Sequence, residues 1–138
     1  MSSSTIARAG TYVPAGIALL ALLNLGPAIW IAVAPHSFFH QIGPFGTYNG
    51  HFLGDAAAFE GGIGLALAAA VRWPALRAGA LAAALGATAL HALNHWIDVN
   101  HAHAGSNAGA TDAISLTLLA LFTAVLLAAQ LRAVEAAR

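Results

Sequence analysis

The chain contains no cysteine and no lysine, and only 7% of its 138 residues are charged. Without cysteine there can be no disulfide framework, no thiol nucleophile and no thiolate zinc site. Five arginines are balanced by five acidic residues, so no basic surface is present to bind nucleic acid. Soluble domains carry about 25% charged residues, which is far more than this chain has. The composition therefore excludes a soluble globule, a disordered chain and a nucleic-acid-binding protein.

Hydrophobic residues make up 59% of the chain and gather into long runs. A helix needs roughly 20 apolar residues to cross a bilayer core of about 30 Å. Four segments reach that length, at about 13–34, 51–71, 74–97 and 111–131. The connections between them are short, so neighbouring helices should run in opposite directions. The sequence thus predicts one all-α domain, an integral membrane, up-down-up-down four-helix bundle embedded in the lipid bilayer.

Breakers and capping residues set the expected boundaries of these spans. Pro35 should end the first span, and Thr111 is placed to cap the fourth helix. The small residues 32–34 resemble a signal-peptide cleavage site. However, the apolar run before them is longer than a typical signal sequence, and proline follows directly. We therefore interpret the first segment as a retained span.

The arginines predict how the bundle is oriented. They lie before the first span, at the turn between the second and third spans, and after the fourth span: Arg8, Arg72, Arg77, Arg132 and Arg138. The other two loops, 35–50 and 98–110, contain none. By the positive-inside rule both termini are cytoplasmic in a multi-pass protein of the plasma (inner) membrane.

Most of the ionisable residues fall in the outward loops and the outward halves of the spans. They are His36, His40, His51, Asp55, His91, His95, Asp98, His101, His103 and Asp112. A rise of about 1.5 Å per residue puts His95 roughly 5 Å and His91 roughly 10 Å below the outer end of the third span. Asn24 in the first span falls at about the level of His91. Ionisable groups at such depths are candidates for function.

The spacing of these residues predicts a metal site. His51 and Asp55 share one helical stripe, as do His91 and His95, and charged stripes should face the bundle interior. Two imidazoles and two further N/O ligands suit a transition metal ion such as Zn, Cu or Fe. Asp98, Asp112 and Asn24 are expected to support the ligands, while four outward histidines are secondary capture groups: His36, His40, His101 and His103.

Other interpretations of the same cluster stay open. The His and Asp side chains can form a metal-free catalytic or proton-relay network, or a structural one that fixes helix register. Haem b is a further candidate, held by His51 with His91 or His95, but the carboxylates in the same stripes would crowd a macrocycle. Glu60 is expected to point away from the cluster, and Gly61, Gly62 and Gly64 to allow close helix packing.

Two sequence segments resemble motifs of a known protein family. The first runs Gly43-Pro44-Phe45, then Asn49-x-His51-Phe52-x-x-Asp55, and the second is His91-Ala92-Leu93-x-His95-x-x-Asp98. Together they resemble a family of small four-span bacterial integral membrane proteins with no established activity, over about residues 35–98 plus Asp112. This sequence differs in having Gly54 where the family pattern has arginine, and in separating Phe45 from Asn49.

The expected function is a transition metal site, open toward the outside, that acts on a lipophilic small molecule from the outer leaflet. The alternative is a non-catalytic accessory or metal-handling subunit, so the sequence leaves open whether the chain is an enzyme. Small residues along the second and third spans are compatible with a homo-oligomer or a larger membrane complex. Ser115, Thr117 and Thr123 are expected to form helix-to-helix hydrogen bonds. Phe38, Phe39, Phe45 and Phe52 are expected to be packing and interface residues.

Overall fold

The computed structural model describes residues 3–44, 46–100 and 108–138. This part of the chain is helical, with no strand: α1 (Ser3–Val33), α2 (Pro35–Gln41), α3 (Gly50–Arg72), the 3₁₀ turn η1 (Pro74–Leu76), α4 (Arg77–Ile97) and α5 (Ala108–Ala136). Four segments are long and apolar enough to cross a membrane: Tyr12–Val33, Gly50–Arg72, Pro74–Ile97 and Gly109–Ala136. Each begins within two residues of the span that the sequence predicts.

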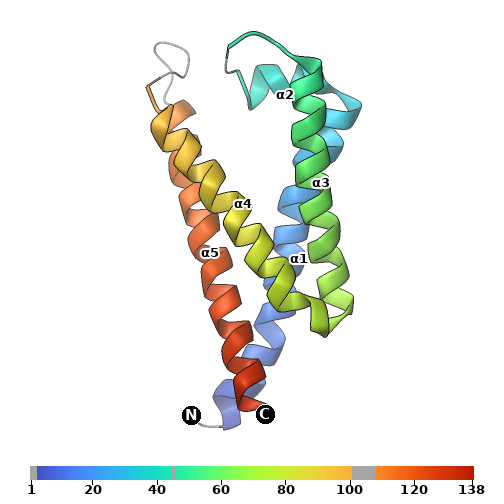
Figure 1. Ribbon diagram of the computed structural model, residues 1–138, viewed down its shortest axis with the longest axis vertical. Helices are drawn as coiled ribbons and strands as arrows, with labels where there is room; N and C mark the ends of the chain where they lie inside the picture. The colour runs from blue at the N-terminus through green and yellow to red at the C-terminus, as the bar shows by residue number, and fades with distance from the viewer. Residues whose placement is uncertain (1–2, 45, 101–107) are drawn as a thin grey trace.

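The four long helices are arranged as two pairs, α1 with α3 and α4 with α5 (Figure 1). Successive long helices run in opposite directions, and both termini lie at the same end as the turn between α3 and α4. The two pairs meet at that end, here called the closed end. They diverge toward the other end, here called the open end, where α2 lies. The bundle is therefore V-shaped.

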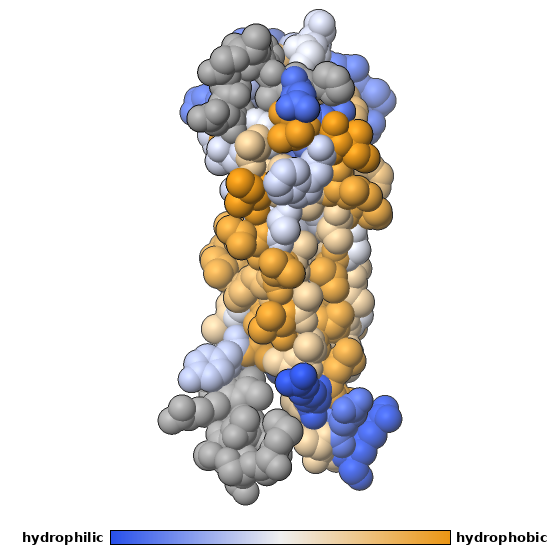
Figure 2. All heavy atoms as spheres, turned by 90° about the vertical axis from the view of Figure 1, so that its left-hand side faces the viewer, coloured by the Kyte–Doolittle hydropathy of each residue, from blue (hydrophilic) through white to orange (hydrophobic). Residues whose placement is uncertain are grey.

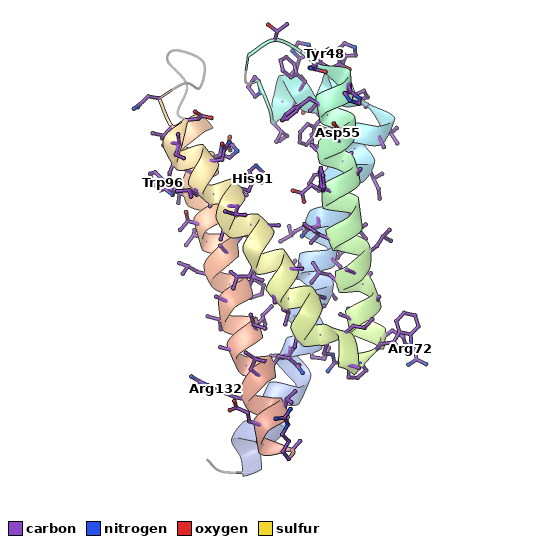
Figure 3. All side chains as sticks on the ribbon, viewed as in Figure 1. Tyr48, Asp55, Arg72, His91, Trp96 and Arg132 are labelled. Carbon is purple, nitrogen blue, oxygen red and sulfur yellow. The ribbon has the colours of Figure 1, made fainter. Side chains whose placement is uncertain are left out.

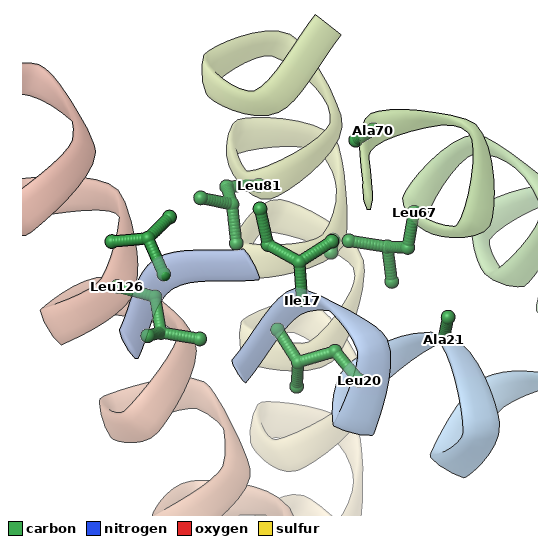
Figure 4. Packing of buried hydrophobic residues seen from close by; sticks show 9 residues of the cluster. Ile17, Leu20, Ala21, Leu67, Ala70, Leu81 and Leu126 are labelled. Carbon is green, nitrogen blue, oxygen red and sulfur yellow. The ribbon is translucent and has the colours of Figure 1, made fainter. Parts of the chain in front are cut away.

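A small apolar core joins the two pairs in the closed half of the bundle (Figure 4). Ile17 of α1, Leu67 of α3 and Leu81 of α4 have no exposed surface, and Leu126 of α5 is 6% exposed. Arg77 adds polar contacts at this end, because its guanidinium donates to the carbonyls of Ala70 (3.2 Å) and Val71 (3.4 Å). Those carbonyls belong to the last turn of α3, which has no intrahelical donors for them. The closed end is thus the firmly packed part of the molecule.

The outer surface has the pattern of a protein that spans a membrane. Figure 2 shows hydrophobic residues around the middle of one face and hydrophilic residues toward both ends. Large apolar side chains are exposed on all four long helices, including Leu22, Ile29, Leu65, Leu90, Leu118 and Val125. In water such a surface would be costly, whereas lipid tails solvate it.

Of two span boundaries predicted from the sequence, the end of the first span is confirmed and the start of the fourth is wrong. Pro35 follows the first span as expected, but it also starts the short helix α2, where proline at the first helical position needs no hydrogen-bond partner. α2 packs back on α1 through an edge-to-face contact between Trp30 and Phe38, with ring centroids 5.6 Å apart. Thr111 is not the cap of the fourth span, because α5 already begins at Ala108. The Ala and Gly residues before Thr111 extend the helix instead.

Candidate functional site

A cavity of about 410 Å³, here called the upper cavity, lies between the two helix pairs toward the open end. Most of its wall is apolar, and three aromatic rings contribute to it: Phe38, Phe39 and Phe52. The ionisable side chains on the wall are His91 and His95 from α4 and Asp112 from α5. Three of the phenylalanines expected to be packing and interface residues therefore line a cavity, and Phe45 lies outside the described residues.

A second cavity of about 310 Å³, the lower cavity, adjoins the first. It is lined by residues of all four long helices, and its polar side chains include Asn24, Glu60 and Thr88. Four residues line both cavities: Phe38, Ala56, His91 and Leu116. We call the two cavities together the cleft. Figure 3 shows His91 projecting from α4 into the space between the helix pairs, where the cavities meet.

His91 and His95 form a close pair one turn apart on α4. Their Nε2 atoms are 3.1 Å apart, and the ring centroids are separated by 4.9 Å. At that distance one ring donates a hydrogen bond and the other accepts it, so at least one imidazole of the pair is neutral. The two histidines predicted to act together are thus in contact and face the upper cavity.

Asp112 lines the same cavity from near the start of α5, on the opposite helix of the α4–α5 pair from His91. The relative position of α4 and α5 is fixed close by, because Trp96 Nε1 donates to Thr117 Oγ1 at 2.9 Å. The predicted helix-to-helix hydrogen bond is confirmed for Thr117. It is wrong for Thr123, which donates to Leu119 O of its own helix, while Ser115 lies on the cavity wall.

His51 and Asp55 form a separate pair. Their closest nitrogen and oxygen atoms are 3.7 Å apart, and the two side chains are 90% and 58% exposed. Neither residue lines the cleft, whose wall on α3 is formed by the following residues, Phe52 and Ala56. At the start of α3 the pair can turn toward water instead of the bundle interior.

The expectation that Glu60 points away from the candidate site is wrong. Glu60 lines the lower cavity together with His91. Phe52, Ala56 and Glu60 follow one another at intervals of four, which places them along one side of α3. Glu60 therefore continues, about two turns deeper, the cleft wall that Phe52 begins.

The supporting residues fall in different places. Asn24 is 7% exposed, donates from Nδ2 to Leu20 O at 2.8 Å, and lines the lower cavity with His91. Their shared depth agrees with the estimate from the rise per residue. Asp98 is the C-cap of α4 and does not line either cavity.

The two outward histidines that the structure describes, His36 and His40, do not line the cleft. His36 stacks on Tyr48 with ring centroids 3.9 Å apart, and His40 on the same helix is exposed. His101 and His103 lie outside the described residues.

In the part of the chain that the structure describes, no three His, Asp or Glu side chains are arranged to hold a metal ion. The four predicted ligands lie as two pairs, His51 with Asp55 and His91 with His95. What the helices do bring together is His91, His95 and Asp112 on the wall of an aromatic cavity. Metal binding stays a prediction.

Comparisons with models of protein families, with curated proteins and with solved structures gave no match. The functional interpretation therefore rests on the geometry of the cleft.

Proposed function

We propose that the chain is an integral membrane protein whose cleft binds a lipophilic small molecule with a polar end. One observation carries the proposal: a largely apolar cavity of about 410 Å³ whose wall carries His91, His95 and Asp112. Ligand sites have this composition, a volume of about 300–1,000 Å³ with apolar and aromatic walls and a few placed polar groups. The aromatic walls would hold the body of the ligand and the three polar side chains its polar end.

The arginine distribution supports an orientation in the inner membrane with the closed end in the cytoplasm. The described arginine side chains, Arg72, Arg77, Arg132 and Arg138, lie toward the closed end, as Figure 3 shows for Arg72 and Arg132. The cleft would then open toward the outer leaflet, from which a lipophilic molecule can reach it. A neutral imidazole of the His pair would be available to accept or donate a proton at the ligand.

Filling the cleft at Ala56 should abolish ligand binding, because Ala56 lines both cavities and its replacement by phenylalanine would occupy their junction. The probe is a photoactivatable diazirine derivative of a C16 fatty alcohol, applied to the protein in lipid nanodiscs. We expect crosslinks on cleft-lining peptides of the unmodified protein. In Ala56→Phe the yield of these crosslinks should fall roughly tenfold or more, which corresponds to a loss of over about 1.4 kcal/mol of binding free energy.

Ala58→Phe is the matched control. Ala58 is exposed on the same helix and does not line the cleft, so this variant should crosslink as the unmodified protein does. Crosslinks confined to the lipid-facing side chains, or equal labelling of both variants, would show that the cleft is not a ligand site.

A transition metal at the His pair is the second candidate function. The 3.1 Å between the two Nε2 atoms is close to the separation of about 3.4 Å expected for two nitrogen ligands at 2.0–2.1 Å from one tetrahedral ion. Asp112 on the same cavity is the available third ligand, provided that its side chain moves to the pair.

Elemental analysis of the purified protein tests this candidate. We expect about one equivalent of Zn, Cu or Fe in the unmodified protein, and at least a tenfold loss when His91 and His95 are both changed to alanine. His51→Ala separates the two possible ligand sets. Unchanged metal content in that variant supports the His91, His95 and Asp112 site, whereas metal loss supports the four-ligand set predicted from sequence. Equal metal content in the unmodified protein and the double variant would rule out both.

A further inference from the structure

Where the structure describes its wall, the cleft has acidic side chains but no arginine. Among its described lining residues, Glu60 of α3 and Asp112 of α5 are acidic, and the others capable of charge are His91 and His95. The hydrogen bond within the His pair keeps at least one of those rings neutral. With both carboxyl groups ionised, the cleft therefore carries a net negative charge even when the other imidazole is protonated.

The two carboxyl groups belong to opposite sides of the cleft. Glu60 comes from the α1–α3 pair and lines the lower cavity, while Asp112 comes from the α4–α5 pair and lines the upper one. His91 lines both cavities. A positively charged group in the cleft would thus meet a carboxylate from each helix pair, one in each cavity, and both carboxylates would repel an anion.

The remaining wall also suits a cation with an apolar body. Phe38, Phe39 and Phe52 offer aromatic rings, whose faces attract a cation that has left water. In the lower cavity Asn24 uses its amide nitrogen to bind Leu20 O, which leaves its oxygen as an acceptor. Aromatic faces, carboxylates and an amide oxygen all interact favourably with positive charge.

We propose that the ligand of the cleft is a hydrophobic organic cation, an amine or quaternary onium compound, with its charge between Glu60 and Asp112. This inference rests on the proposed function and names its ligand class. An ionised carboxylate in a site partly shielded from water attracts a monovalent cation and repels an anion of the same shape. Binding of the cation would in turn favour the ionised form of both carboxyl groups.

Two hydrophobic ions of the same shape and opposite charge provide the test. Radiolabelled tetraphenylphosphonium and tetraphenylborate are equilibrated with the full chain in nanodiscs of neutral lipid, and binding to empty nanodiscs is subtracted. We expect the cation to bind at least about tenfold more tightly than the anion. Glu60→Gln should weaken cation binding by about tenfold or more, because it removes the charge without changing the size of the side chain.

Glu135→Gln is the matched control, since Glu135 is exposed near the C-terminus and away from the cleft. It should bind both ions as the unmodified protein does, and gel filtration and helical circular dichroism should confirm that both variants are folded. Equal binding of the two ions, preference for the borate, or no effect of Glu60→Gln would overturn the charge assignment.

The fatty-alcohol crosslinks separate this failure from failure of the proposed function. If the neutral probe labels the cleft in an Ala56-dependent way but tetraphenylphosphonium does not bind, the cleft is a ligand site for another class of molecule. If the fatty-alcohol crosslinks do not depend on Ala56 and Glu60→Gln does not weaken tetraphenylphosphonium binding, both inferences are wrong.

Discussion

Replacing Gly64 by leucine should push α1 and α3 apart and lower the free energy of unfolding by about 1–3 kcal/mol, the range found for overpacked cores. A Cβ atom at Gly64 would lie 2.7 Å from Leu25 Cγ and 3.1 Å from the backbone nitrogen of Leu25. The backbone contact matters most, because a side chain can rotate away whereas the backbone of α1 can move only with the helix. The measurement is unfolding in mixed micelles with increasing SDS, followed by helical circular dichroism.

Gly62→Leu is a closely matched control for Gly64→Leu. Gly62 lies two residues away on the same helix, and a Cβ atom there would meet nothing within 4 Å. Both substitutions gain the same helix propensity of about 0.8–1 kcal/mol relative to glycine, so the difference between them isolates packing on α1. Gly62→Leu should leave stability unchanged or slightly raised. Equal stability of the two variants would contradict the close approach of α1 and α3 at Gly64.

The sequence predicts the long helices well because span length and breaker residues are local signals. It does not predict α2, a helix of seven residues whose sequence, PHSFFHQ, has little helix propensity. The helix is held by contacts with the end of α1, namely Phe38 against Trp30 and Trp30 Nε1 donating to Ser37 Oγ at 3.4 Å. Contacts of this kind cannot be deduced from periodicity. Yet α2 contributes two of the three phenylalanines of the upper cavity.

The sequence predicts how deep the side chains of the candidate site lie along the helices, but only partly which side of each helix faces the cleft. The rise per residue correctly places Asn24 and His91 at one level, since both line the lower cavity. The rule that charged stripes face inward fails for His51, which lies at the exposed start of α3 and needs no internal partner. Because His51 was expected to face inward, Glu60 on the other side of α3 was expected to face away from the site. The rotation of α3 is instead set by glycine contacts. Gly61 and Gly64 pack on α1, and this turns the adjacent Glu60 toward the cleft.

Single cysteines at the two ends of the bundle should react with a membrane-impermeant maleimide from opposite sides of the membrane. Because the chain has no cysteine, each introduced residue is the only thiol and the background is zero. Asn100, exposed just after α4, and Ala75, exposed in η1 between α3 and α4, are the test positions. In spheroplasts we expect nearly complete labelling of Asn100→Cys and nearly none of Ala75→Cys until the cells are lysed.

The direction of this result decides which compartment supplies the ligand. The open end carries Asn100 and the mouth of the cleft, and the closed end carries η1 and Arg72 (Figure 3). The expected pattern requires the cleft to take its ligand from the outer face or outer leaflet. The reverse pattern would require it to take its ligand from the cytoplasmic side, and would show that arginines do not set the orientation of this chain. Labelling of both cysteines before lysis would mean that the chain inserts in both orientations. Membrane proteins can do so when only a few charges favour one orientation over the other.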